Sequence, residues 1–481
     1  MNRHEDQQEG AVDKPNIVFL FADDQRFDTL RALGNHDIRT PNLDQLIERG
    51  TAFRQAHIPG GTVGAVCMPS RAMLHTGRTL FHIHDDGRSI PEEHFLLGET
   101  FRKAGYATCG IGKWHNGYAS FNRSFSDGDD IFFGGMEDHW NVPAYHYHAD
   151  GNYSATLPMI RDRMLSNEVE YRHGDQVQAG IHSTDLFSDA AVNWVNRYKE
   201  DRPFFLYVSY MAPHDPRSMP NKYMKLYDPA LLTLPVNVAS EHAFDYGVRD
   251  IRDERLAVYP RTEEEIRRHL AEYYAMITHL DDRIGDIMFA LKESGRYDNT
   301  IIVFAGDNGL AVGQHGLMGK QSCYEHSVRV PLLFSGPGVS KGQQRQEFVH
   351  LSDIFPTLCE LTDVPIPSTV EGTSLAPLLS GAGAMPERDK LYFAYADLVR
   401  AVKCREYKLI VYRHESQLFR LSEDPSERNN LIGQSETSGI EQTLKNELIE
   451  HSYDSGDREH PAGRQFWQHI DRQQQGADER L

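Results

Sequence analysis

Four apolar segments, each followed at once by polar residues, constrain the fold of this chain more than any other feature. Residues 16–22 lead into an Asp-Asp pair, and residues 106–111 lead into Gly-Lys-Trp-His. Residues 203–211 lead into Ala-Pro-His-Asp-Pro, and residues 300–305 lead into Gly-Asp-Asn-Gly. Because these segments are apolar throughout and do not alternate with polar residues, they are typical of parallel strands buried on both faces.

Helical patterns lie between these segments, at residues 42–50, 97–104, 183–200 and 263–294. In the last of them, apolar residues recur every three or four positions and form one core-facing stripe. The alternation predicts an α/β fold with a large, mostly parallel sheet covered by helices on both faces. Ligands bind beyond the carboxyl ends of the strands in such sheets, so we expect the four polar clusters to converge on one site.

The pattern changes after about residue 386, where short strands are separated by polar turns. This part of the chain predicts a smaller α+β domain with an antiparallel sheet. The expected organisation is therefore a polar tail over residues 1–14, a catalytic domain over 15–385, a small C-terminal subdomain over 386–452, and a polar tail over 453–481.

Two long stretches, residues 132–174 and 217–260, show no regular pattern, and loops of this length are usually functional or disordered. The first is rich in His, Tyr and Trp, which favours a wall or lid of a pocket. A surface excursion with its own small core is the alternative.

Charge and hydropathy restrict the partners. The 481 residues carry 50 Lys and Arg against 70 Asp and Glu, a formal net charge of −20, which argues against nucleic-acid binding. No apolar run reaches the roughly 18 residues that a membrane span needs. The polar start shows no signal peptide, so we expect a cytoplasmic protein, or a periplasmic or secreted one if a leader was trimmed. The five cysteines show neither a CxxC zinc pattern nor a disulfide framework.

Hard oxygen donors follow the first and last apolar segments: Asp23 and Asp24 after one, Asp307 and Asn308 after the other. Such donors suit Ca²⁺ or Mg²⁺ better than zinc. An isolated Asp-Asp pair is usually a solvated turn. Two such pairs at a shared sheet edge favour a metal site.

Cationic side chains belong to the same set of loops: Lys113, His115, His214 and Lys320. Singly, each is typical of a surface residue or of a buried residue with a local partner. Together, and facing a metal, they fit a site for a tetrahedral oxyanion.

One further motif identifies the chemistry. Cys67-Met-Pro-Ser-Arg71, continued by Leu-His-Thr-Gly-Arg78, resembles the signature of the type I sulfatases in the alkaline phosphatase-like superfamily. The strand-end motifs described above also resemble those of the family, in the expected order. The resemblance extends over about residues 15–431.

The resemblance implies specific roles. Cys67 would be oxidised to Cα-formylglycine by a formylglycine-generating enzyme, and the hydrated aldehyde would be the nucleophile. The four oxygen donors and the converted Cys67 would hold Ca²⁺, in preference to Mg²⁺. Arg71 would fix the nucleophile, while Lys113, Lys320 and His214 would bind the sulfate. Either His214 or Lys320 would be the acid for the leaving alcohol, and His115 would be the base for the release of sulfate.

The expected reaction is the hydrolysis of a sulfate ester on a sugar or glycan. An arylsulfatase, or a phosphonate or phosphate monoester hydrolase of the same superfamily, is the alternative because the site would recognise a tetrahedral oxyanion. A second alternative, from another functional class, is a non-catalytic protein that binds sulfated glycans and keeps Cys67 as a thiol.

Overall fold

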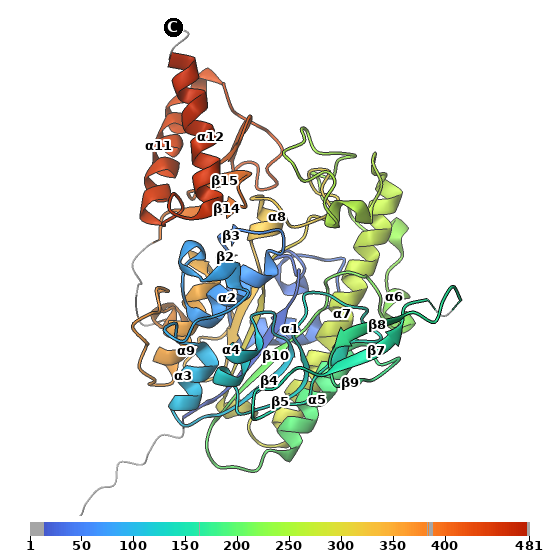
Figure 1. Ribbon diagram of the computed structural model, residues 1–481. Coiled ribbons are helices and arrows are strands. Elements are labelled where there is room, and N and C mark those ends of the chain that lie inside the picture. Colours follow the sequence, from blue (N-terminus) through green and yellow to red (C-terminus); the bar gives the residue numbers. More distant parts are fainter. Residues whose placement is uncertain (1–13, 163, 382, 384–387, 479–481) are drawn as a thin grey trace, which may run out of the picture.

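A mixed sheet of eight strands forms the centre of the computed structural model, which describes residues 14–162, 164–381, 383 and 388–478 (Figure 1). Every pairing in it is parallel except those of β12, which runs against both of its neighbours. The order across the sheet is β13 (Gln343–His350), β2 (Gly50–His57), β12 (Leu332–Ser335), β11 (Thr300–Gly306), β1 (Asn16–Ala22), β10 (Phe204–Ser209), β4 (Ala107–Lys113) and β5 (Asp127–Phe132).

The central strand β1 shows why its sequence is apolar throughout. Phe19 and Phe21 belong to the core cluster on one face of the sheet, and Val18 and Leu20 belong to the cluster on the other face. All four side chains are fully buried. The prediction of parallel strands covered on both faces is therefore confirmed.

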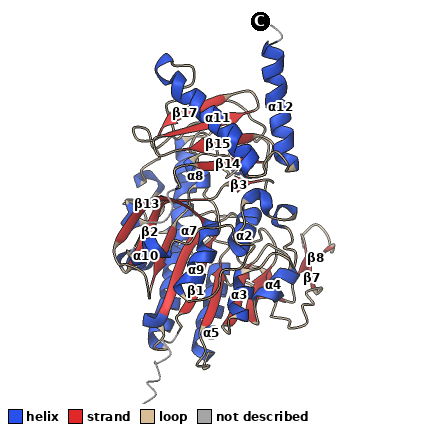
Figure 2. Ribbon diagram, turned by 90° about the vertical axis from the view of Figure 1, so that its left-hand side faces the viewer, coloured by secondary structure: helices blue, strands red, loops and turns tan. Residues whose placement is uncertain are grey.

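Helices supply the two layers (Figure 2). On one face pack α2 (Cys67–Thr76), α3 (Leu97–Lys103) and α9 (Ile354–Leu361). On the other face pack α1 (Pro41–Glu48), α5 (Ser183–Arg197) and the 31-residue α7 (Glu263–Glu293). The shorter helices are α4 (Tyr118–Ser124), α6 (Asn221–Met224), α8 (Glu325–Val328) and α10 (Ala376–Ser380).

A second, smaller sheet lies above the first in Figure 1 and is built mainly from the C-terminal part of the chain. Four of its strands are antiparallel. A fifth, short strand from the N-terminal part of the chain lies at the edge of the sheet and pairs in parallel with β14. The order is β17 (Ser416–Arg420), β16 (Tyr407–Tyr412), β15 (Val399–Lys403), β14 (Leu391–Tyr395) and β3 (Gly60–Gly61).

The C-terminal end of the chain differs from the expected polar tail. Helix α11 (Ser438–Asp454) is followed by α12 (Pro461–Asp478), and Phe466 and Trp467 of α12 are buried in the core of the small sheet. Of the α12 side chains that the structure describes, Phe466, Trp467 and Ile470 contribute to that core, so a largely polar sequence is compatible with this helix. Apart from Lys14, the predicted N-terminal tail lies outside the described residues, as do residues 385 and 386 at the proposed domain boundary.

The two irregular stretches contain little regular structure. The first holds a hairpin of β7 (Thr156–Ile160) and β8 (Val169–His173), and β6 (Pro143–Ala144), which pairs with β9 (Gln176–Val177). The second holds α6 and short 3-10 turns. Across the described parts of the chain, no helix combines the length and the apolar character that crossing a bilayer requires.

Candidate active site

Cys67 is the first residue of α2 and lies beside the carboxyl end of the large sheet. Its thiol is almost fully buried, with 3% of the residue exposed. The Sγ atom lies 3.6 Å from His115 Nδ1 and 3.8 Å from Lys113 Nζ. Burial raises the pKa of the thiol, whereas Lys113 and Lys320 act in the opposite direction. An unmodified Cys67 is therefore held as a thiol and not as a reactive thiolate.

The four predicted oxygen donors converge directly beneath this thiol. Ligand atoms of Asp23, Asp307 and Cys67 lie within 4.8 Å of one another. The Asp24 backbone N–H donates to Asp307 Oδ1 at 3.0 Å, and Asn308 Nδ2 donates to Asp24 Oδ1 at 2.7 Å. The turn after β1 makes this possible because Asp24 adopts a left-handed conformation, with φ at 65°.

Two oxygens of this group have no hydrogen-bond partner although they are buried: Asp23 Oδ1 and Asn308 Oδ1. Burial and the neighbouring Asp23 raise the pKa of Asp307 to about 7. Unpaired oxygens and crowded carboxylates are costly unless a cation lies between them. The donor set therefore fits a hard divalent cation.

Arg71 is part of α2 and links this helix to the carboxylates. Its Nε donates to Asp307 Oδ2 at 3.1 Å, and its Nη1 donates to Ser209 Oγ at 2.6 Å and to the Lys113 carbonyl at 3.2 Å. Burial opposes its charge, but Asp307 and Asp23 raise the pKa of Arg71 above its usual value. The residue is fully buried, so its guanidinium positions the site without facing the cavity.

The two predicted lysines each pair with one of the two aspartates that follow β1. Lys113 Nζ forms an ion pair with Asp23, and Lys320 Nζ donates to Asp24 Oδ1 at 2.6 Å. Burial alone would lower the pKa of Lys320, but Asp24 and Cys67 raise it well above its usual value. Lys320 therefore carries a proton at its Nζ throughout the neutral pH range.

The two histidines are neutral. Burial, followed by Lys113, lowers the pKa of His115 well below its usual value, and burial lowers that of His214 to about 4. His214 Nδ1 lies 2.7 Å from the backbone oxygen of Asp215, which can only accept, so this nitrogen carries the proton. His214 Nε2, 3.6 Å from Asp24, is then unprotonated.

A cavity of about 310 Å³ opens above these groups. Cys67, His115, His214 and Lys320 line it, so four of the predicted residues face the space where a ligand would bind. The remaining predicted residues, Asp23, Asp24, Arg71, Lys113, Asp307 and Asn308, lie below and around the thiol and are at most 1% exposed.

Sequence reasoning missed the upper wall of this cavity. Arg252 and Asp253 come from the second irregular stretch, and Tyr395 comes from β14 of the small sheet. Met136 from the first irregular stretch also contributes. No motif marks these positions. The length of the two stretches and the aromatic residues of the first predicted a wall or lid without naming its residues, and nothing in the sequence indicated Tyr395.

His75, which is also on α2, makes the stability of the fold depend on pH. It packs 4.3 Å from Trp114 and 4.9 Å from Tyr207, measured between ring centroids, and burial, followed by Arg71, lowers its pKa to about 3. Below pH 6.5 the imidazole of His75 takes up a proton in the unfolded chain but stays neutral in the folded chain. The contribution of neutral His75 to the free energy of unfolding is therefore lost as pH falls from 6.5 towards 3.

We therefore expect His75→Phe to flatten the pH dependence of stability. At about 1.4 kcal/mol per pH unit, His75 should account for a loss of roughly 3 kcal/mol in the free energy of unfolding by pH 4.5. Urea unfolding of both proteins at pH 7 and pH 4.5 measures this difference. Equal losses in the two proteins would contradict it.

Comparison with known proteins gives a consistent result. The family model described as Sulfatase matches residues 15–364, and the model described as N-sulphoglucosamine sulphohydrolase, C-terminal, matches residues 313–454. An arylsulfatase of Clostridium perfringens is 29% identical over 455 residues, covering 88% of this chain and 91% of its own. An N-acetylglucosamine-6-O-sulfatase of Bacteroides thetaiotaomicron is 22% identical, and the match covers 92% of this chain and 87% of that enzyme.

Solved structures share the fold. The phosphonate monoester hydrolase of Agrobacterium radiobacter superposes with a TM-score of 0.72 at 21% identity, covering 92% of this chain and 96% of its own. A protein solved in complex with its substrate D-glucosamine-2-N,6-O-disulfate superposes with a TM-score of 0.70 at 21% identity, and the match covers 93% of this chain and 99% of that protein.

Proposed function

The chain belongs to the sulfatase family and is a sulfuric ester hydrolase, and on this premise we propose that it removes sulfate from a sulfated sugar, using a formylglycine nucleophile made from Cys67. One observation carries the proposal. The Cys67 thiol forms the floor of a cavity, with unpaired oxygen donors and the side chains of Lys113 and Lys320 around it. The sugar is supported by relatives that include the N-acetylglucosamine-6-O-sulfatase.

The oxygen donors Asp23, Asp24, Asp307 and Asn308 are the residues that would hold Ca²⁺, together with the converted Cys67. A bound Ca²⁺ would polarise a sulfate oxygen and favour the alkoxide form of the nucleophile. Lys113 and Lys320 would bind the remaining sulfate oxygens, since both ammonium groups lie at the edge of the carboxylate cluster.

The conversion of Cys67 would require a formylglycine-generating enzyme as a partner. In the hydrated aldehyde, one hydroxyl oxygen would attack sulfur as the bond from sulfur to the ester oxygen breaks, and deprotonation of the second hydroxyl would then expel sulfate and restore the aldehyde. An ordinary alcohol or thiol lacks the second hydroxyl and would remain sulfated.

The protonation states favour Lys320 over His214 as the acid. Lys320 carries a proton at Nζ and lines the cavity, whereas the single proton of His214 is on Nδ1, which donates to the Asp215 carbonyl. His115 is neutral, and its Nδ1 faces Cys67 Sγ, so it is placed to accept the proton of the second hydroxyl.

We expect Lys320→Met to lose more activity on poor leaving groups than on good ones. An alkyl or sugar alcohol needs a proton as it leaves, so kcat/KM should fall by about 10²–10⁴-fold. With 4-nitrophenyl sulfate the loss should be at least tenfold smaller. In the control, His214→Asn should lower kcat/KM for both substrates in similar proportion. Equal losses for Lys320→Met on both substrates would assign Lys320 to sulfate binding alone.

Paired kinetics test the proposed reaction. The purified protein should hydrolyse 4-nitrophenyl sulfate with a higher kcat/KM than 4-nitrophenyl phosphate, because one divalent cation and two lysines suit a monoanionic sulfate better than a phosphate dianion. Faster phosphate or phosphonate turnover would favour the alternative hydrolase. Sulfate release from a panel of sulfated mono- and oligosaccharides then identifies the sugar.

A further inference from the structure

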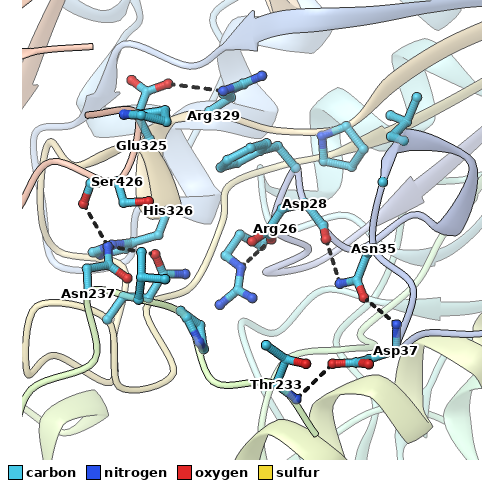
Figure 3. A pocket seen from close by; sticks show the side chains of 18 of the residues that line it. Arg26, Asp28, Asn35, Asp37, Thr233, Asn237, Glu325, His326, Arg329 and Ser426 are labelled. Atoms are coloured by element: carbon cyan, nitrogen blue, oxygen red, sulfur yellow. Dashed lines mark hydrogen bonds and ion pairs between the residues drawn. The ribbon is translucent and has the colours of Figure 1, made fainter. Parts of the chain in front are cut away.

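A second cavity, of about 450 Å³, lies apart from the catalytic pocket and shares none of its lining residues. It is bounded by the turn that follows β1, by β2, by α8 and the loop after it, and by the loops at residues 233–237 and 425–427 (Figure 3). Its rim includes exposed residues such as Val236 and Pro425, so the cavity is open to solvent.

Three arginines from three different segments line this cavity: Arg26, Arg54 and Arg329. Figure 3 shows Arg26 reaching from the end of β1 towards the middle of the space. Arg26 is fully buried, and Arg329 has its guanidinium carbon 4.0 Å from the centre of the Phe27 ring. Both side chains are thus held in place before any ligand binds.

Two of the three arginines already pair with carboxylates of the lining, Arg26 with Asp28 and Arg329 with Glu325, so the charge that is not compensated is that of Arg54. Among the described residues, no carboxylate lies within 4.0 Å of the guanidinium of Arg54, which donates to the Leu33 carbonyl at 2.8 Å and to Gln344 at 3.3 Å. Asp28 pairs with Arg26, and Asp37 accepts from the Thr233 N–H. Glu325 pairs with Lys403, Lys408 and Arg329, and Glu427 pairs with Lys408.

Two further observations indicate an absent partner. His326 Nδ1 is buried at the wall of the cavity and has no hydrogen-bond partner. Burial lowers the pKa of Arg54, and burial together with the nearby Arg54 lowers that of Arg329. An anion between these guanidinium groups would reduce their repulsion and accept their hydrogen bonds.

We propose that this cavity is a second, non-catalytic binding site for a sulfate group, either as the free ion that the reaction releases or as the substituent of a further sugar unit. Planar guanidinium groups suit the paired oxygens of such an oxyanion. The identification of sulfate, rather than another oxyanion, rests on the proposed function.

The site is also linked to the catalytic centre. The Tyr273 hydroxyl accepts from the Arg26 N–H at 2.8 Å and donates to the Asp24 carbonyl at 2.5 Å. A sulfate held by Arg26 would thus lie on the far side of the short segment that carries two of the proposed metal ligands.

Equilibrium dialysis with radiolabelled inorganic sulfate, at constant ionic strength, tests the proposal on the metal-loaded protein. We expect two sulfates per chain. Arg54→Gln should weaken one of them at least tenfold, as expected for the loss of a charge-assisted hydrogen bond, and should leave kcat unchanged. Arg49→Gln, which removes an exposed arginine outside the cavity, should keep both.

Lys320→Met separates the two sites, because it should weaken only the catalytic one. The second site would be overturned if the wild type bound one sulfate per chain and Lys320→Met abolished that binding. It would also be overturned if Arg54→Gln and Arg49→Gln bound sulfate equally well. The same titration with glucosamine 6-sulfate, on the Cys67→Ala protein, distinguishes the sources. At least tenfold tighter binding than inorganic sulfate identifies a sugar substituent, and equal or weaker binding identifies the free ion.

Discussion

Cys67→Ala should abolish turnover of sulfate esters while leaving the fold intact. Removal of a nucleophile from a preorganised site costs about 10⁴-fold or more in kcat. Cys67 is the first residue of α2, and within the described part of the chain its Sγ has two hydrogen-bond partners, His115 and Lys113. We therefore expect a change of about 1 kcal/mol or less in the free energy of unfolding, since alanine is a good helix former. Steady-state kinetics and urea unfolding measure the two effects.

Cys404→Ala is the matched control because Cys404 is partly exposed in the small sheet and lies outside the catalytic cavity. It should keep the wild-type kcat. Intact mass spectrometry of the wild type should show the loss of mass that accompanies conversion of a thiol to an aldehyde, and Cys67→Ala should not show it. Full turnover by an unconverted Cys67, or by Cys67→Ala, would remove the nucleophile assignment.

Removal of the divalent cation should have an effect of similar size. Treatment with a chelator should lower kcat by about 10³-fold or more, because the site would lose its Lewis acid and would leave Asp23, Asp24 and Asp307 facing one another. Added Ca²⁺ should restore activity. It should also raise the free energy of unfolding by about 3 kcal/mol at a hundred times its dissociation constant.

Asp307→Asn should lose both the activity and the stabilisation by Ca²⁺, since one carboxylate ligand becomes neutral. Asp298→Asn, whose side chain is 92% exposed near the opposite end of β11, is the matched control and should retain both. Thermal unfolding with and without Ca²⁺ supplies a measurement independent of activity. A chelated protein with unchanged stability and turnover would exclude the metal site.

The sequence predicted which strand-end residues converge at the floor of the cavity, for a physical reason. Parallel strands buried on both faces must be apolar along their whole length, so β1, β4, β10 and β11 can be recognised without any partner. The residues that follow them, such as Asp23 and Asp307, meet because the strands end at one edge of one sheet. Local sequence and topology are sufficient for this part of the site.

The cavity walls could not be predicted in the same way. Tyr395 reaches the catalytic cavity because β14 pairs with β3, a contact between positions more than three hundred residues apart. Arg54 and Arg329 line the second cavity only because β2 and the loop after α8 are neighbours in space. Such contacts depend on which distant strands and loops become neighbours in the fold, and a single sequence contains no periodic signal for that. The helix α12 was missed for a different reason, since few of its side chains are apolar.

The pairing of β3 with β14 has a consequence for the order of events during synthesis. Residues 60–78 leave the ribosome long before residues 391–395 do. Until the later segment arrives, the wall that Tyr395 contributes is absent, and Cys67 lies on a chain that has not closed around it. A maturing enzyme that must reach the sulfur would therefore find it on the nascent polypeptide, before the last strands complete the molecule.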